Sequence, residues 1–257
     1  MRTVAVTRYV TPLREGGSLP AVVEADDAGL YVLKFRGAGQ GPKALVAELV
    51  AGELARAAGL PMPDLVLVEL DPELARTEGD PEIQDLIRAS AGLNLALDYL
   101  PGALTFDPAA DPPDPELASA IVWFDAFVQN VDRSARNPNL MVWHRQLTLI
   151  DHGAALYFHH DWTGVAQAAL SPFPLIRDHV LLPFASALEA ADARMAAAFD
   201  AATIARVLAL VPDAWLEHDA DGIDAAARRT GYADHLLRRL DGRRVFLEEA
   251  LRARAAL

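Results

Sequence analysis

The sequence contains no cysteine and only two lysines, Lys34 and Lys43. Without cysteine there can be neither a disulfide bond nor a cysteine-based zinc site, which fits a cytoplasmic protein. Acidic residues outnumber basic residues by 36 to 23, and the formal net charge is −13. Because non-specific binding to nucleic acid depends on Lys and Arg side chains that neutralise phosphates, we expect no direct nucleic-acid binding.

Long apolar runs are also missing. No uncharged apolar run approaches the length of a membrane span, and the first residues, MRTVAVTRYVTPLREGG, lack the apolar segment of a signal peptide. We therefore expect a soluble, cytoplasmic protein that does not associate with membranes. Hydrophobic residues still make up 52% of the 257 residues, so the chain can bury a sizeable core as one large domain or two lobes.

The first hundred residues indicate an α+β arrangement. The segments TVAVTRYV, LPAVVEA and GLYVLKF are separated by the turn-forming REGG and DDAG, which predicts an antiparallel meander over residues 1–36. Apolar residues at helical spacing follow Pro42 and end at Gly59, which predicts a helix. A strand at 64–70, a short helix over PEIQDLIRAS and a strand at 93–100 are expected to follow.

The rest of the chain is predicted to be mostly helical. A Pro- and Asp-rich loop at 106–115 leads into the apolar helix ELASAIVWFDAFVQN, in which Trp123, Phe124 and Phe127 share one face and should lie in the core. LMVWH and QLTLID are typical of a hairpin. From about residue 165 the pattern is helical to the end of the chain.

The most polar stretch, NVDRSARNPNL at 130–140, lies between the apolar helix and the hairpin, and the hairpin ends in LIDHG. Together these stretches contain D-x-x-x-x-N, from Asp132 and Asn137, followed by D-x-G at Asp151. Transfer of phosphate from ATP needs a carboxylate that orients or deprotonates the acceptor, and oxygen ligands for magnesium. Asp132 would be the base, and Asn137 and Asp151 the metal ligands. The alternative is a loop in which Asp and Asn side chains form turns.

A cation and a carboxylate precede this motif. Lys34 ends the strand LYVLKF, and Glu48 lies beside the apolar face of the following helix. Because an unpaired buried charge is costly, Glu48 needs a partner, and Lys34 is the natural candidate. In kinases such a lysine contacts the ATP phosphates and is oriented by a helix carboxylate. Each residue alone could equally be a solvated surface residue, so their order relative to Asp132, Asn137 and Asp151 favours the kinase interpretation.

The turn REGGSLP lies between the first two expected strands, where kinases place a turn that covers the phosphates. Gly16 and Gly17 would allow the backbone to approach a phosphate closely, and Ser18 could donate a hydrogen bond to it. Gly-Gly is also an everyday hairpin turn. The sequence contains no P-loop motif.

Over residues 10–160 the chain resembles the HipA-like kinases, particularly the short members of that family. The resemblance is carried by YVLKF, AELVAGELARAAGLPMP, FDAFVQNVDRSARNPNLMV and LTLIDHGAALYF. It implies a bilobal protein-kinase-like fold, with a β-rich nucleotide-binding lobe at 1–100 and a mostly helical catalytic lobe at 101–257. It also implies ATP and magnesium as cofactors, and a protein serine or threonine as acceptor.

The resemblance further assigns the individual residues. Lys34, with Glu48, would contact the ATP phosphates, Asp132 would be the catalytic base, and Asn137 and Asp151 would bind magnesium. A connector between the lobes at 97–100, which includes Asp98 and Leu100, would meet adenine through its backbone.

Two other interpretations stay open. A small-molecule kinase, similar in design to aminoglycoside phosphotransferases, would suit a cationic acceptor because the chain is acidic. A nucleotide-binding pseudokinase could act as a regulatory module. The sequence does not indicate an oligomeric state.

Two further pairs of polar residues allow narrower expectations. Arg133 and Arg136 could bind phosphate or an acidic substrate, or be solvated at the surface. His159 and His160 are adjacent, so on an extended segment their side chains point to opposite faces, and we predict a surface loop there rather than a metal site.

Overall fold

Five strands within the first hundred residues form a closed barrel in the computed structural model, which describes residues 1–13, 19–217, 219 and 221–257. The strand order is β1-β2-β3-β5-β4. The first three strands form the expected antiparallel meander, and β1 also pairs in parallel with β4, which closes the sheet. The strands are β1 (Thr3–Pro12), β2 (Ala21–Ala25), β3 (Leu30–Lys34), β4 (Leu65–Leu70) and β5 (Gly92–Asp98).

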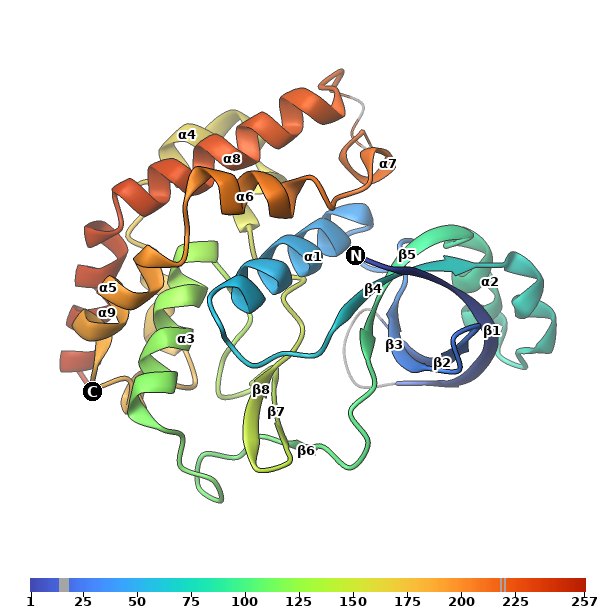
Figure 1. The fold of residues 1–257 in the computed structure, drawn as a ribbon, viewed down its shortest axis with the longest axis horizontal. Coiled ribbons are helices and arrows are strands. Elements are labelled where there is room, and N and C mark those ends of the chain that lie inside the picture. The colour runs from blue at the N-terminus through green and yellow to red at the C-terminus, as the bar shows by residue number, and fades with distance from the viewer. Residues whose placement is uncertain (14–18, 218, 220) are drawn as a thin grey trace.

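Helix α1 (Pro42–Ala57) connects the barrel to the helical part of the molecule (Figure 1). Proline fits the first turn of a helix because its missing N–H would have no partner there. The chain leaves the helix through Gly59, whose φ of 74° favours glycine. The 3-10 helix η1 (Pro72–Thr77) and α2 (Pro81–Ala89) pack together beside the barrel, and α2 contributes Ile83 and Ile87 to its core.

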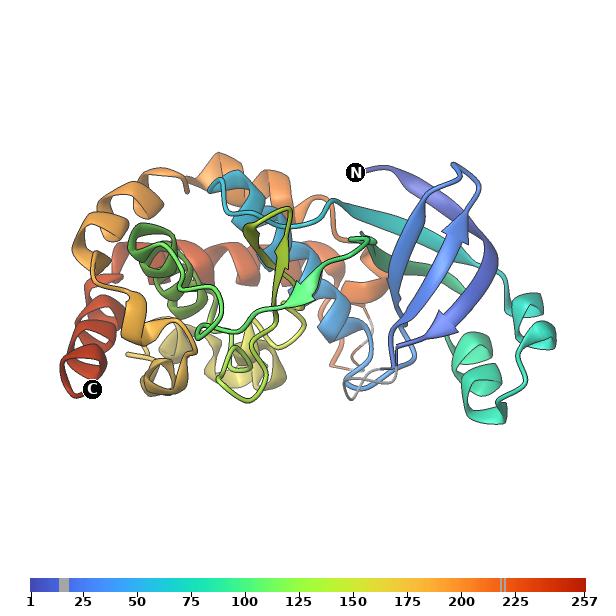
Figure 2. The same cartoon turned by 90° about the horizontal axis from the view of Figure 1, so that it is seen from below.

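The second part of the chain contains a three-stranded sheet in the order β6-β7-β8 and a group of helices (Figure 2). The predicted hairpin is confirmed as β7 and β8, and the predicted apolar helix as α3. Among the described residues no helix is both long and apolar enough to cross a membrane. The elements are β6 (Leu104–Thr105), α3 (Pro115–Val128), β7 (Leu140–Trp143), β8 (Gln146–Leu149), η2 (Tyr157–His160), η3 (Trp162–Gly164), α4 (Val165–Ala168), η4 (Pro174–Asp178), η5 (Leu182–Phe184), α5 (Leu188–Ala197), α6 (Ala201–Leu208), α7 (Asp213–Leu216), α8 (Ala225–Asp241) and α9 (Arg244–Ala255).

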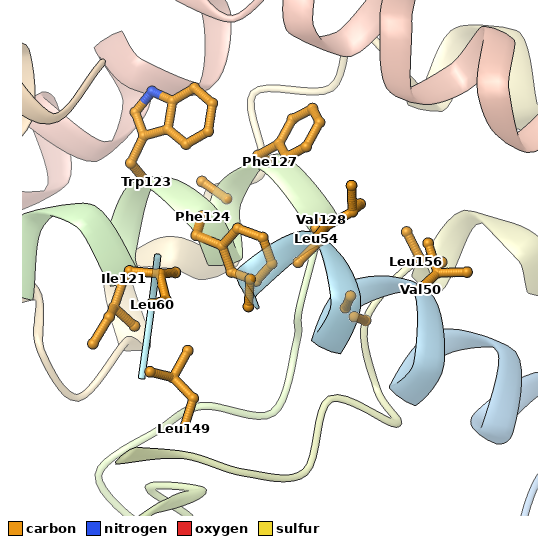
Figure 3. Packing of buried hydrophobic residues seen from close by; sticks show 14 of the residues in the cluster. Val50, Leu54, Leu60, Ile121, Trp123, Phe124, Phe127, Val128, Leu149 and Leu156 are labelled. Carbon is orange, nitrogen blue, oxygen red and sulfur yellow. The ribbon is translucent and has the colours of Figure 1, made fainter. Parts of the chain in front are cut away.

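The larger of two buried apolar clusters joins α1 to the helices of the second part (Figure 3). Trp123, Phe124 and Phe127 of α3 belong to it, as predicted, and the rings of Trp123 and Phe127 stack with centroids 5.4 Å apart. Val50 and Leu54 bring α1 into the same cluster, and α1 also contacts α6 and α7. The smaller cluster fills the barrel. Glu48 on α1 is therefore held in place relative to the helical part as well as to the barrel.

Candidate active site

Lys34 joins three separate elements at the edge of the barrel. Its side chain extends from the end of β3 and its Nζ donates to Oε2 of Glu48 on α1, at 3.1 Å. The same ammonium lies 2.5 Å from Oδ1 of Asp151, which follows β8. The structure thus brings together three residues that the sequence separates by 14 and 117 positions.

The three charges determine one another's ionisation. Burial alone would lower the pKa of Lys34, but the carboxylates of Glu48 and Asp151 raise it above its usual value. Burial raises the pKa of Glu48, whose side chain is 1% exposed, and the ammonium of Lys34 offsets this only in part. For Asp151 the ammonium outweighs burial and lowers the pKa. Lys34 is therefore charged at neutral pH and stabilises the ionised form of both acids.

Asp151 has a backbone conformation that is uncommon for a residue other than glycine. Asp151 belongs to no helix or strand, and its φ is 54°, in the left-handed region. Such conformations persist only where the surroundings impose them, and they are common at active sites. The side chain of Asp151 is 43% exposed and lines the cleft described below.

Asp132 and Asn137 lie in the loop between α3 and β7 and contact each other. Nδ2 of Asn137 donates to Oδ2 of Asp132 at 2.8 Å. Because the amide nitrogen is used in this way, the amide oxygen of Asn137 is the atom that it can offer to a cation. Asn139 donates to the backbone oxygen of Asp132 at 3.1 Å, and the backbone N–H of Asp132 donates to Oδ1 of Asn130 at 3.2 Å. These bonds fix the loop on both sides of Asp132.

Arg133 is buried, so the expectation that it binds phosphate or lies at the surface is wrong. Its guanidinium and the carboxylate of Asp125, on α3, are both fully buried, with Nε of Arg133 2.5 Å from Oδ2 of Asp125. Nη1 of Arg133 donates to the backbone oxygens of Asn139 and Ile150. The physical reason is that this one side chain satisfies buried acceptors from the loop of Asp132 and from the residue before Asp151. Arg136, in contrast, is exposed.

His179 completes this buried network. Its Nδ1 accepts a hydrogen bond from the backbone N–H of Leu181, so Nε2 carries the proton and donates to Oδ2 of Asp125 at 2.9 Å. Sequence reasoning missed both Asp125 and His179. A carboxylate within the apolar helix ELASAIVWFDAFVQN should have suggested a buried partner for Asp125, whereas no local pattern marks His179.

A cleft of about 980 Å³ opens beside these groups, between the barrel and the sheet that contains β7. Lys34, Asp151 and Asn137 line it, and so do Asp98 and Leu100. The N–H of Asp98 donates to the backbone oxygen of Asp64. Among the described residues the N–H of Leu100 has no acceptor, so it can donate to a ligand. Gly16, Gly17 and Ser18 lie outside the described residues.

The oxygen groups on this cleft fit a hard cation. Asp151 provides an exposed carboxylate and Asn137 an amide oxygen, which are the ligand types that Mg²⁺ prefers. Across the described part of the chain, no three His, Cys, Asp or Glu side chains gather closely enough to form a metal cage. A magnesium ion here would therefore depend on phosphate oxygens for part of its coordination, as is usual in kinases.

The fold and the cleft define a bilobal molecule of the protein-kinase-like class, and solved structures confirm this. The Helicobacter pylori proinflammatory kinase CtkA superposes with a TM-score of 0.58 at 13% identity, covering 97% of this chain and 98% of CtkA. The Golgi casein kinase with Mn and ADP bound has a TM-score of 0.53 at 12% identity, covering 96% of this chain and 74% of that protein. At these identities the similarity establishes the fold.

A model of the HipA-like kinase family matches residues 6–247. The chain therefore belongs to the HipA-like kinase family, and the kinase class expected from the sequence is confirmed. No curated protein sequence gives a significant match.

Proposed function

We propose that this chain is an ATP- and magnesium-dependent phosphotransferase that modifies serine or threonine residues of a protein acceptor. The observation that carries the proposal is the position of Lys34, whose ammonium contacts Glu48 and Asp151 at the wall of the cleft. A lysine on a strand, held by a helix carboxylate beside a D-x-G aspartate, is the arrangement with which protein kinases grip ATP phosphates. Membership of the HipA-like kinase family supports it.

Nucleotide binding is assigned to the walls of the cleft. Lys34 would contact the phosphates, with Glu48 holding the ammonium in place from the other side. The adenine base would meet the backbone of Asp98 and Leu100, where the N–H of Leu100 can donate. The Golgi casein kinase, which has the same fold, was solved with Mn and ADP bound, and this supports a nucleotide in the cleft. Gly16, Gly17 and Ser18 are proposed to cover the phosphates.

Magnesium would be held by Asn137 and Asp151, which offer oxygen ligands from two different loops. When bound, the ion would neutralise charge on the phosphates of ATP. Asp151 also contacts Lys34, so the ammonium and the metal ligand lie next to each other at the expected position of the phosphates.

Asp132 is proposed as the base that accepts the proton of the acceptor hydroxyl. The hydroxyl oxygen forms a bond to the γ-phosphorus, the bond from that phosphorus to the oxygen of ADP breaks, and the proton passes to the Asp132 carboxylate. Asn137 and Asn139 orient this carboxylate and its backbone. Mutual orientation of this kind is the main contribution of a protein to phosphoryl transfer.

The proposal is tested with γ-labelled ATP and Mg²⁺, using casein, myelin basic protein and the chain itself as acceptors. We expect label on serine or threonine with the wild type. The Asp132→Asn variant should lose at least about a hundredfold in rate while its affinity for Mg·ADP is retained. The matched control is Asp178→Asn, which changes an exposed carboxylate and should retain the wild-type rate.

Three results would contradict parts of the proposal. Full activity of Asp132→Asn would exclude Asp132 as the base. Transfer only to cationic small molecules would indicate a small-molecule kinase. Tight binding of ATP by the wild type without transfer to any acceptor would indicate a pseudokinase.

A further inference from the structure

One face of α8 follows the segment that comes after the Asp-His-Gly motif. We call residues 157–171 the post-motif segment; it contains η2, η3 and α4. The residues of α8 that contact it recur at helical spacing, as expected for a single face. Figure 1 shows α8 running along this region, with α4 next to it. The contacting residues are Arg228, Gly231, Tyr232, His235, Arg238 and Arg239.

The first contact is at Trp162. The guanidinium of Arg228 lies 4.8 Å from the centre of the Trp162 ring, which is a cation–π distance. Gly231 lies so close to the same ring that a Cβ atom at this position would be 2.7 Å from Cζ2 of Trp162. The indole is rigid and cannot bend away as a long aliphatic side chain could. The absence of a side chain at Gly231 therefore allows α8 and the segment to approach each other.

The central contacts involve two histidines. His159 is buried, not in a surface loop as predicted, and its Nδ1 lies 3.0 Å from the hydroxyl of Tyr232. Burial keeps the pKa of His159 well below its usual value, so the imidazole is neutral. The ring of Phe158 stacks on His235 with centroids 3.5 Å apart, and Nδ1 of His235 lies 3.0 Å from the backbone oxygen of Val165.

The last contact is made by Arg239, which is 1% exposed. Its Nη1 donates to the backbone oxygens of Ala169 and Ser171, at 3.1 and 2.8 Å. Its Nε donates to the backbone oxygen of Phe127 at 2.8 Å, in the last turn of α3. The guanidinium directs its donors at backbone oxygens, so it connects α3 and the post-motif segment without any acidic side chain. Arg239 thus fixes the end of the segment to α3.

Two cations beside this segment, Arg228 and Lys43, have acidic partners in the structure. Arg228 donates to Asp221 at 2.6 Å and to Asp219 at 3.3 Å, and Lys43 at the start of α1 lies 3.0 Å from Asp219. In many kinases the corresponding segment becomes ordered only when a phosphate on it pairs with arginine side chains. Here the carboxylates of Asp219 and Asp221 neutralise Arg228 without any modification.

The segment is also connected to the candidate base. It leads through η4 to His179, which donates to Asp125, the partner of Arg133. The backbones of Ser134 and His179 also pair in an isolated antiparallel β-bridge. An ordered segment therefore helps to fix the position of Asp132, which directly precedes Arg133.

We propose that α8 holds the post-motif segment permanently in its ordered conformation, so that phosphotransfer requires no covalent modification of this segment. The second half of this proposal, that phosphotransfer requires no covalent modification, rests on the proposed kinase function. The first half, that α8 holds the segment in its ordered conformation, does not.

Hydrogen exchange of the full chain tests the first half without any need for activity. Gly231→Ala should favour the helix, because Ala is the better helix former, while its methyl group displaces Trp162. We expect exchange in peptides from 157–171 to become about tenfold faster, the equivalent of one lost contact, and exchange in the barrel to stay unchanged. Asp234→Ala, on the exposed side of α8, is the control and should leave the segment unchanged. Tyr232→Phe should increase exchange only around His159. Unchanged exchange in both Gly231→Ala and Tyr232→Phe would overturn the proposal.

Phosphatase treatment tests the second half. Wild-type protein is treated until its intact mass shows no phosphate, and the initial rate of transfer from Mg·ATP to casein is compared with that of untreated protein. We expect equal rates, and a loss of about tenfold or more after treatment would overturn the proposal. If untreated protein transfers no phosphate either, the proposed function and this second half both fail, and the exchange experiment still decides the first half.

Discussion

The Asp125→Asn substitution tests how the buried network supports the loop of Asp132. In the described part of the chain, three side chains contact the Asp125 carboxylate and all are donors: Arg133 at 2.5 Å, His179 at 2.9 Å and Asn130 at 3.1 Å. An asparagine keeps the shape but must direct its NH₂ group at one of these donors. It also leaves the guanidinium of Arg133 buried without a counter-charge.

The expected loss of folding free energy follows from the complete burial of Asp125 and Arg133. The side chains of Asp125 and Arg133 are both 0% exposed, and removal of one partner of a buried pair costs about 3–5 kcal/mol. Since 1 kcal/mol lowers the unfolding temperature of a chain of this size by roughly 2–4 °C, we expect a decrease of roughly 6–20 °C. Urea unfolding followed by circular dichroism measures the free energy, and a thermal scan measures the temperature.

The control changes a carboxylate to an amide in an exposed ion pair. Glu24 pairs with Arg8 at 2.5 Å, but their side chains are 37% and 62% exposed, and such pairs contribute about 1 kcal/mol or less. Glu24→Gln should therefore have little effect. If Asp125→Asn cost no more than Glu24→Gln, the buried network could not be what fixes the loop, and the role given to Arg133 would have to be abandoned.

Three further predictions concern polar side chains of the site and of the post-motif segment. Glu48→Gln removes a charged acceptor from Lys34, and a hydrogen bond to a charged group contributes about 1.5–3 kcal/mol. We therefore expect kcat/KM for ATP to fall roughly ten- to a hundredfold. Steady-state kinetics with varied ATP would show this decrease, and an unchanged kcat/KM would contradict the role of Glu48. Asn137→Ala should raise the Mg²⁺ concentration for half-maximal activity by about tenfold or more, whereas an unchanged Mg²⁺ dependence would exclude Asn137 as a ligand. Because burial lowers the pKa of His159, the native state takes up its proton at lower pH than the unfolded state does, so this histidine makes the protein less stable as pH falls below about 6.5. His159→Gln should abolish that contribution, which is at most about 2 kcal/mol at pH 5, and parallel urea-unfolding profiles of variant and wild type from pH 7 to 5 would refute it.

Local patterns were sufficient to predict several of the elements and one contact of the candidate site. The meander, α1, α3 and the β7–β8 hairpin follow from apolar spacing and turn residues, and the pairing of Lys34 with Glu48 follows from the cost of a buried carboxylate. The parallel pairing of β1 with β4 was not predictable in this way, because it joins segments about sixty residues apart. Periodicity describes one segment at a time and does not identify its neighbours.

The two incorrect predictions have the same physical origin. Arg133 was assigned to a ligand or to solvent because it lies in a polar loop, yet its partner is eight residues back in an apolar helix. His159 was assigned to a surface loop, yet Tyr232, which buries it, is 73 residues further along the chain. In each case a polar side chain is buried because a distant element supplies its partner, and the short window around the residue contains no sign of that partner.

The position of Lys34 also explains why Glu48 is buried on α1. Without the ammonium, the carboxylates of Glu48 and Asp151 would face each other, and the burial that raises the pKa of Glu48 would favour its neutral form. With Lys34 between them, the ammonium favours the ionised form of both acids, and Asp151 stays exposed to the cleft. If a metal ion then binds Asp151, the ammonium still has Glu48 as a partner and can turn toward a phosphate without being left unpaired. A buried partner on a helix fixed by the core of the second lobe therefore suits the role proposed for Lys34, in which the ammonium exchanges Asp151 for a phosphate.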